Sequence, residues 1–132
     1  MTRSGGGHVV NIASIAGIRA TGSSVPYAAS KAALNQLARV AALEWAGDNI
    51  RINVVHPNAV YDTGIWSEAV LRDRATHYGI SVEEYKRRST LLGVEVTSRD
   101  VAELTNRTKA AHLAKTNPTY RTTLTKAHLS TR

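Results

Sequence analysis

The chain has 132 residues with 17 Lys and Arg against 10 Asp and Glu, which gives a formal net charge of +7. This length allows one ordinary domain at most, and 42% apolar with 20% charged residues is typical of a soluble globular protein rather than a disordered or collagen-like one. No apolar run approaches the roughly 18 residues of a membrane helix, the N-terminus has no signal-peptide pattern, and the absence of Cys excludes disulfides and thiolate chemistry, so we expect a cytoplasmic protein without a membrane partner.

The first elements predict a strand, a helix and a second strand. Residues 8–13 form a short apolar run, which indicates a buried strand. After a loop rich in Gly, Ser and Thr, Pro26 suits the first turn of a helix over residues 27–45. Residues 50–55 are β-branched and end before Pro57, as a second strand would. Such a unit has parallel strands and a right-handed crossover, so we predict an α/β fold, a partial Rossmann-like doubly wound parallel sheet.

The predicted helix carries one continuous apolar stripe at helical spacing, which we expect to pack in the core. Its members are Leu34, Leu37, Ala38, Ala41, Ala42 and Trp45.

Further helices are indicated beyond the second strand. Residues 65–78 have a helical pattern, Ser81 and Glu84 form a capping box that opens a short helix, and Thr97 with Asp100 resembles another helix start.

The C-terminal segment is a different kind of sequence. Residues 104–132 carry six basic residues, eight Thr and no acid, whereas residues 1–103 are nearly neutral. The segment has no clean period, so we divide the chain into a folded part, 1–104, and an irregular or disordered basic tail, 105–132. A nucleic-acid-binding role for this tail is the alternative that its charge leaves open.

Three polar side chains fall where a parallel sheet places reactive groups. Ser14 follows the first strand, and Tyr27 and Lys31 lie one turn apart on one face of the helix. A nearby ammonium stabilises a phenolate, which lets a Tyr transfer protons at neutral pH, and a Ser hydroxyl can donate to a substrate oxygen. A capping Ser and an ordinary surface pair are the alternative, but roughly 0.014 matches to this spacing are expected by chance at this composition. The triplet therefore predicts interconversion of an alcohol and a carbonyl, given a hydride carrier.

The sequence around these residues resembles the second half of a short-chain dehydrogenase/reductase. The resemblance covers about residues 5–104 and rests on three motifs, VNIAS at 10–14, YAASK at 27–31 and RINVVHP at 51–57. Residues 65–79 and 91–97 further resemble the dehydrogenase portion of bifunctional rhamnulose-phosphate aldolase/dehydrogenase proteins.

The resemblance implies roles for the three polar residues and a cofactor, NAD or NADP. Ser14 would stabilise the substrate carbonyl oxygen and Tyr27 would be the general acid/base. Lys31 would support the Tyr27 phenolate and bind the nicotinamide ribose. The substrate would be a small alcohol or carbonyl compound, with sugar derivatives among the candidates, and the helix would pack against a second copy in a homo-oligomer. The cofactor contacts expected from the resemblance are Tyr27, Lys31, Pro57, Asn58, Val60 and Thr63.

Several departures from the family pattern leave alternatives open. The Gly-rich phosphate loop belongs to an N-terminal half that we do not find here, Asn58 stands where Gly is usual, and Thr63 lies one residue late. We therefore expect a truncated NAD(P)-dependent oxidoreductase, with a non-catalytic remnant or interaction fragment as the alternative. His56 is expected to be a packed or solvent-facing loop residue, and the five His have no metal-ligand spacing.

Overall fold

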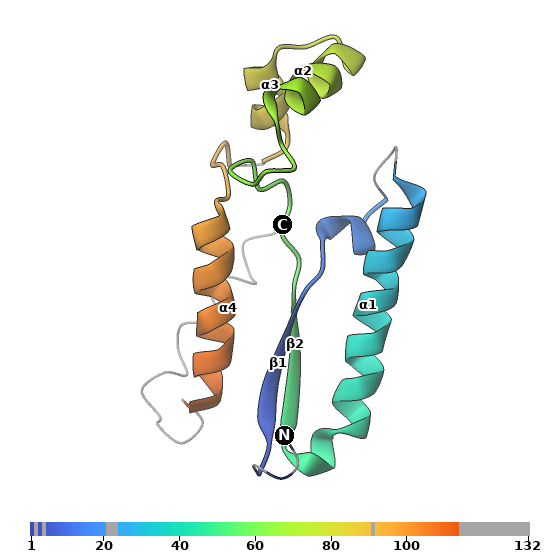
Figure 1. The fold of residues 1–132 in the computed structure, drawn as a ribbon, viewed down its shortest axis with the longest axis vertical. Coiled ribbons are helices and arrows are strands. Elements are labelled where there is room, and N and C mark those ends of the chain that lie inside the picture. Colours follow the sequence, from blue (N-terminus) through green and yellow to red (C-terminus); the bar gives the residue numbers. More distant parts are fainter. Residues whose placement is uncertain (2, 4, 21–23, 91, 114–132) are drawn as a thin grey trace.

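The computed structural model describes residues 1, 3, 5–20, 24–90 and 92–113 of the chain (Figure 1). In this part β1 (Gly7–Ile12) and β2 (Ile50–Val55) form a parallel pair in which Gly7 is opposite Ile50 and Ile12 is opposite Val55. Figure 1 shows α1 (Val25–Glu44) on one side of the strand pair, α4 (Ser98–Leu113) on the other, and α2 (Glu68–His77) with α3 (Val82–Arg88) beyond the carboxyl ends of the strands. This arrangement confirms the predicted α/β fold with a parallel sheet. The elements are β1 (Gly7–Ile12), η2 (Ile15–Gly17), α1 (Val25–Glu44), η3 (Ala46–Asp48), β2 (Ile50–Val55), α2 (Glu68–His77), α3 (Val82–Arg88) and α4 (Ser98–Leu113).

The crossover helix α1 begins and ends close to where the sequence predicts. Pro26 lies in its first turn, where the missing N–H costs no helical hydrogen bond. Past its end, Asn49 takes a left-handed conformation, with φ of 55°, that turns the chain into β2. Asn tolerates this conformation better than most residues. Its Nδ2 also donates to the Gly5 carbonyl at 3.2 Å, which ties the turn to the segment before β1.

The prediction that the whole apolar stripe of α1 is core is wrong. Ala38 and Ala41 are buried, but Leu37 is 59% exposed and Trp45 is 42% exposed. A two-stranded sheet offers a helix only a narrow contact surface, so only the small residues nearest the strands are covered in the described part of the chain. Leu43 is exposed as well, at 81%.

Helices α2 and α3 begin with Ser caps. The hydroxyl oxygens of Ser67 and Ser81 accept hydrogen bonds from the N–H groups of Val70 and Glu84. Helix α2 therefore starts three residues later than predicted, because Ser67 supplies the cap. The capping box of α3 is half formed, since the Glu84 carboxylate accepts from Arg87 and Arg88 instead.

Helix α4 begins at the helix start predicted from Thr97 and Asp100 but continues further than predicted. Thr97 N–H donates to the Asp100 carboxylate at 2.8 Å, and Asp100 N–H donates to the Thr97 hydroxyl at 3.2 Å. The helix runs through Leu113, so irregular structure was the wrong prediction for residues 105–113. The hydroxyls of Thr105 and Thr108 donate to carbonyls one turn earlier, which lets Thr fit within the helix. The remainder of the predicted tail, 114–132, lies outside the described residues.

The core of the described part is small. No side chain there is less than 2% exposed, and large apolar residues remain at the surface. None of the helices described here combines the length and hydropathy that a membrane crossing requires. The buried apolar residues are Ala13, Ala38, Ala41, Ile50, Val55, Tyr61, Leu71 and Ala75.

Gly17 is expected to be indispensable for the contact between η2 and α1. A Cβ at this position would lie 2.7 and 2.8 Å from the carbonyl carbon and oxygen of Lys31, which are backbone atoms that cannot turn away. We predict that Gly17→Ala lowers the free energy of unfolding by about 1–3 kcal/mol, measured by urea denaturation.

Gly47→Ala is the matched control, because a Cβ at Gly47 would meet nothing within 4 Å. That substitution should leave stability unchanged or raise it slightly by restricting the unfolded chain. Equal losses for both variants would contradict the assigned role of Gly17.

Candidate functional site

The candidate site lies at the carboxyl end of β1, where pairing with the β2 segment continues past the strand ends. Ala13 N–H donates to the Val55 carbonyl at 2.8 Å, and Ile15 N–H donates to the Pro57 carbonyl at 3.0 Å. Ser14, between these two bonds, is 9% exposed. Its hydroxyl oxygen accepts from Ala16 N–H at 3.2 Å as the cap of η2.

Tyr27 and Lys31 reach the same end of the sheet from the first turns of α1. Lys31 Nζ donates to the Ile12 carbonyl at 3.1 Å and lies 5.7 Å from the centroid of the Tyr27 ring. Tyr27 is 46% exposed, so part of its surface is open to a ligand. The structure thus brings the elements that carry Ser14, Tyr27 and Lys31 together, and these residues provide two hydroxyls and one ammonium.

The loop of residues 57–63, predicted to contact a cofactor, is fastened to the segment that follows α3. Asn58 Nδ2 donates to the Ser89 carbonyl, and Val60 forms an isolated parallel bridge with Val96. Thr63 Oγ1 donates to the Val60 carbonyl at 2.8 Å, which closes a turn within the loop. These hydrogen bonds fix the shape of the loop. The Pro57 carbonyl also accepts from Ile15 N–H, which joins the loop to residues 13–15, the extension of β1.

Asp62 adds a polar clasp between this loop and α4. Its carboxylate accepts from Ser98 N–H at 2.9 and 3.0 Å and from the Ser98 hydroxyl at 2.7 Å. The hydrogen bond from the Ser98 hydroxyl is the main cause that lowers the pKa of Asp62 below its ordinary value of 3.8, with the Ser98 N–H second. Sequence reasoning missed this pair, because a contact between residues 36 positions apart leaves no local pattern.

An aromatic cluster packs beside helices α2 and α3, and the sequence did not predict it. Tyr61 and Trp66 meet edge to face with centroids 5.0 Å apart, and Tyr78 stacks on Tyr85 at 6.0 Å. The Lys86 ammonium lies 5.1 Å from the Tyr61 centroid. Burial is the main cause that raises the pKa values of Tyr61 and Tyr85. Neither hydroxyl is thus suited to act as a base near neutral pH.

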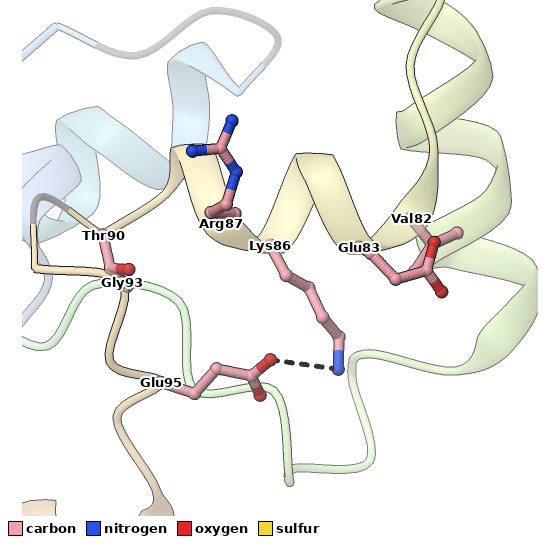
Figure 2. A pocket seen from close by; sticks show the side chains of 7 residues that line it. All are labelled: Val82, Glu83, Lys86, Arg87, Thr90, Gly93 and Glu95. Atoms are coloured by element: carbon pink, nitrogen blue, oxygen red, sulfur yellow. Dashed lines mark ion pairs between the residues drawn. The ribbon is translucent and has the colours of Figure 1, made fainter.

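Neither of two cavities in the described part of the chain is lined by Ser14, Tyr27 or Lys31. The first cavity, of about 260 Å³, lies along α3 (Figure 2). Lys86 and Glu95, which line it, form an ion pair at 3.5 Å. Its acidic and basic groups are balanced in number, so it favours no ion of one sign. The other, of about 330 Å³, lies between α1 and β2, and His56 is among its lining residues. Within the described residues, no cluster of three or more His, Cys, Asp or Glu could hold a metal ion.

Comparison with known families and proteins identifies one family. The family model for short chain dehydrogenases matches residues 1–74. A tropinone reductase homologue from Arabidopsis thaliana is 56% identical over 54 residues, which are 41% of this chain and 20% of that protein. An NAD-dependent glycerol dehydrogenase from Listeria innocua is 43% identical over 60 residues, 46% of this chain and 24% of that protein. The chain therefore spans only about a fifth to a quarter of these relatives.

Solved structures show the same likeness in three dimensions. A short chain dehydrogenase family protein from Francisella tularensis superposes with a TM-score of 0.66 at 28% identity, over 77% of this chain and 43% of that one. A variant of actinorhodin polyketide ketoreductase, solved with NADPH, gives 0.69 at 30% identity, over 81% and 41%.

The clasp between Asp62 and Ser98 predicts a pH dependence of stability. Because the folded state lowers the pKa of Asp62, its contribution to stability is present above pH 3.8 and is lost as the pH falls through the lowered value. The stability difference between wild type and Asp62→Asn should therefore shrink between about pH 5 and pH 2, measured by urea denaturation across this range.

Asp73→Asn removes an exposed carboxylate from α2 and serves as the control. Its stability difference from wild type should not follow this pattern. If the Asp62→Asn difference stays constant over the whole range, the clasp does not contribute through its charge.

Proposed function

The chain belongs to the short chain dehydrogenase family, and from this premise we propose that it carries the proton-transfer residues of an NAD(P)-dependent oxidoreductase. The observation that supports this proposal is the convergence of Tyr27, Lys31 and Ser14 at the end of β1, tied together by the bond from Lys31 Nζ to Ile12. The reaction would interconvert a small alcohol and its carbonyl compound. We further propose that residues 1–104 correspond to the second half of a dehydrogenase domain.

Each residue of the triplet has a part in the proposed proton transfer. The Tyr27 hydroxyl gives its proton to the substrate oxygen during reduction and takes it back during oxidation. The Lys31 ammonium stabilises the phenolate that results, since opposite charges attract over a short distance. Ser14 donates a hydrogen bond to the same substrate oxygen, and its own oxygen is held by Ala16 N–H.

The residues present fit the nicotinamide end of a dinucleotide. An ammonium has three N–H donors, so Lys31 retains two for ribose hydroxyls after its bond to Ile12. Bound NAD or NADP would supply or accept the hydride. We propose that Tyr27 and Lys31 hold it together with the loop residues Pro57, Asn58, Val60 and Thr63. One relative's name specifies NAD and one solved structure contains NADPH, so the proposal covers both.

A non-catalytic role is the second candidate. Hydride transfer needs a donor held in position, and in the described residues no Gly-rich turn joins a strand to a helix to bind a pyrophosphate. The chain also covers only 41–43% of the two solved structures named above. A truncated fragment without turnover would follow if no other polypeptide supplies that part of the site.

Other expectations from the sequence remain predictions. Self-association through α1 is supported by the exposure of Leu37, Val40 and Leu43 on this helix. The likeness to aldolase/dehydrogenase proteins, a sugar-derived substrate and a cytoplasmic location have no further observation behind them. We do not propose nucleic-acid binding, because the charges that suggest it lie mainly beyond residue 113.

Nucleotide binding separates the catalytic role from the remnant. If the chain binds NADH or NADPH, free nucleotide at 100 times its Kd should add about 2.7 kcal/mol of stability, seen as a rise in Tm. No rise at millimolar concentrations of either nucleotide would contradict a working dehydrogenase and favour the remnant.

Substitution of Tyr27 tests the assigned chemistry wherever turnover is measurable. Tyr27→Phe removes only the hydroxyl, so the rate of carbonyl reduction should fall by about 10²–10⁴-fold. Tyr78→Phe is the matched control, since Tyr78 is similarly exposed, at 56%, but lies at the end of α2. Full activity in Tyr27→Phe would show that the proton comes from another group.

A further inference from the structure

The His56 ring contacts the backbone of Ser14, the candidate catalytic serine. It follows β2, and its Nδ1 is 3.1 Å from the carbonyl oxygen of Ser14. A carbonyl oxygen only accepts hydrogen bonds, so Nδ1 must be the ring nitrogen that carries a hydrogen. The contact therefore selects the Nδ1–H tautomer whenever the ring is neutral.

The backbone of residues 55–57 lacks one hydrogen-bond donor toward the residues that follow β1. Val55 and Pro57 accept from Ala13 and Ile15, but Pro57 has no N–H to offer in return. The His56 ring supplies a donor from this segment to the β1 extension. The Ser14 carbonyl also accepts from Gly17 N–H at 3.0 Å, so two donors hold the peptide that follows Ser14.

The rest of the ring packs rather than reaching the substrate side. His56 is half-buried and lines the groove between α1 and β2 together with Ile18 and Val54. None of the predicted catalytic residues lines this groove. A ring in this place orients Ser14 and has no direct part in proton transfer.

We propose that His56 is a positioning residue for Ser14, acting through a hydrogen bond from Nδ1–H to the Ser14 carbonyl. The proposal rests on the proposed function of Ser14. The hydrogen bond fixes the peptide between Ser14 and Ile15, and the Ser14 hydroxyl is thereby held at one place at the end of β1. Loss of the bond would loosen Ser14 without removing any reacting group.

Two substitutions separate this role from general packing. The amide nitrogen of Asn occupies a place close to that of Nδ1, whereas the amide of Gln reaches toward the position of Nε2. His56→Asn should therefore keep the bond and His56→Gln should lose it. In the full chain, the amides of Ile15 and Gly17 should exchange hydrogen about tenfold faster in His56→Gln and remain near wild type in His56→Asn. Equal exchange in the two variants would overturn the proposal.

The tautomer in the wild-type chain gives a test that no substitution can disturb. Nitrogen-15 NMR of the ring at pH 8.5 should show hydrogen on Nδ1, and hydrogen on Nε2 alone would overturn the proposal. Where turnover is measurable, His56→Gln should lower kcat more than it changes KM for the nucleotide, and an unchanged kcat would count against positioning. A chain without turnover but with the Nδ1–H tautomer and the exchange pattern would contradict the proposed function while leaving the role of His56 intact.

Discussion

The hydrogen bond from Lys31 Nζ to the Ile12 carbonyl joins the first turns of α1 to the last residue of β1. Because α1 is the crossover between two parallel strands, this bond ties the start of the helix to the carboxyl end of β1. Gly17 allows the contact by letting η2 approach the Lys31 backbone more closely than any side chain would permit. The relative placement of Ser14 and Tyr27 follows from these two features.

The parallel pair also explains the unfinished surface around the site. Parallel sheets are normally covered on both faces, and here α1 and α4 each cover one side of the two strands that the described part of the chain contains (Figure 1). The buried part of α1 is consequently limited to small residues such as Ala38 and Ala41, while Leu43 faces outward. The candidate residues Ser14, Tyr27 and Lys31 lie at the end of this same narrow strand pair. Association with a second copy or with another polypeptide would bury the exposed apolar side chains of α1.

The sequence predicts the crossover unit and the meeting of the elements that carry Ser14, Tyr27 and Lys31 because both depend on local patterns. The β-branched run at 50–55 and the four-residue step from Tyr27 to Lys31 each determine geometry within one element. Core membership could not be predicted in the same way: Trp45 belongs to the apolar stripe, yet its burial depends on how many strands lie beneath α1. The helical state of residues 105–113 was hidden by their Thr content. Thr105 and Thr108 satisfy their hydroxyls on the preceding turn, a solution that composition does not reveal. The clasp of Asp62 on Ser98 depends on tertiary folding alone.

If the bond between Lys31 and Ile12 holds the site together, NMR should observe that bond directly. A scalar coupling across the hydrogen bond, from Lys31 Nζ to the carbonyl carbon of Ile12, would be measured in the uniformly labelled chain. We expect a resolved coupling and a Lys31 ammonium that exchanges its protons more slowly than that of the exposed Lys109. No coupling, together with exchange as fast as at Lys109, would contradict it.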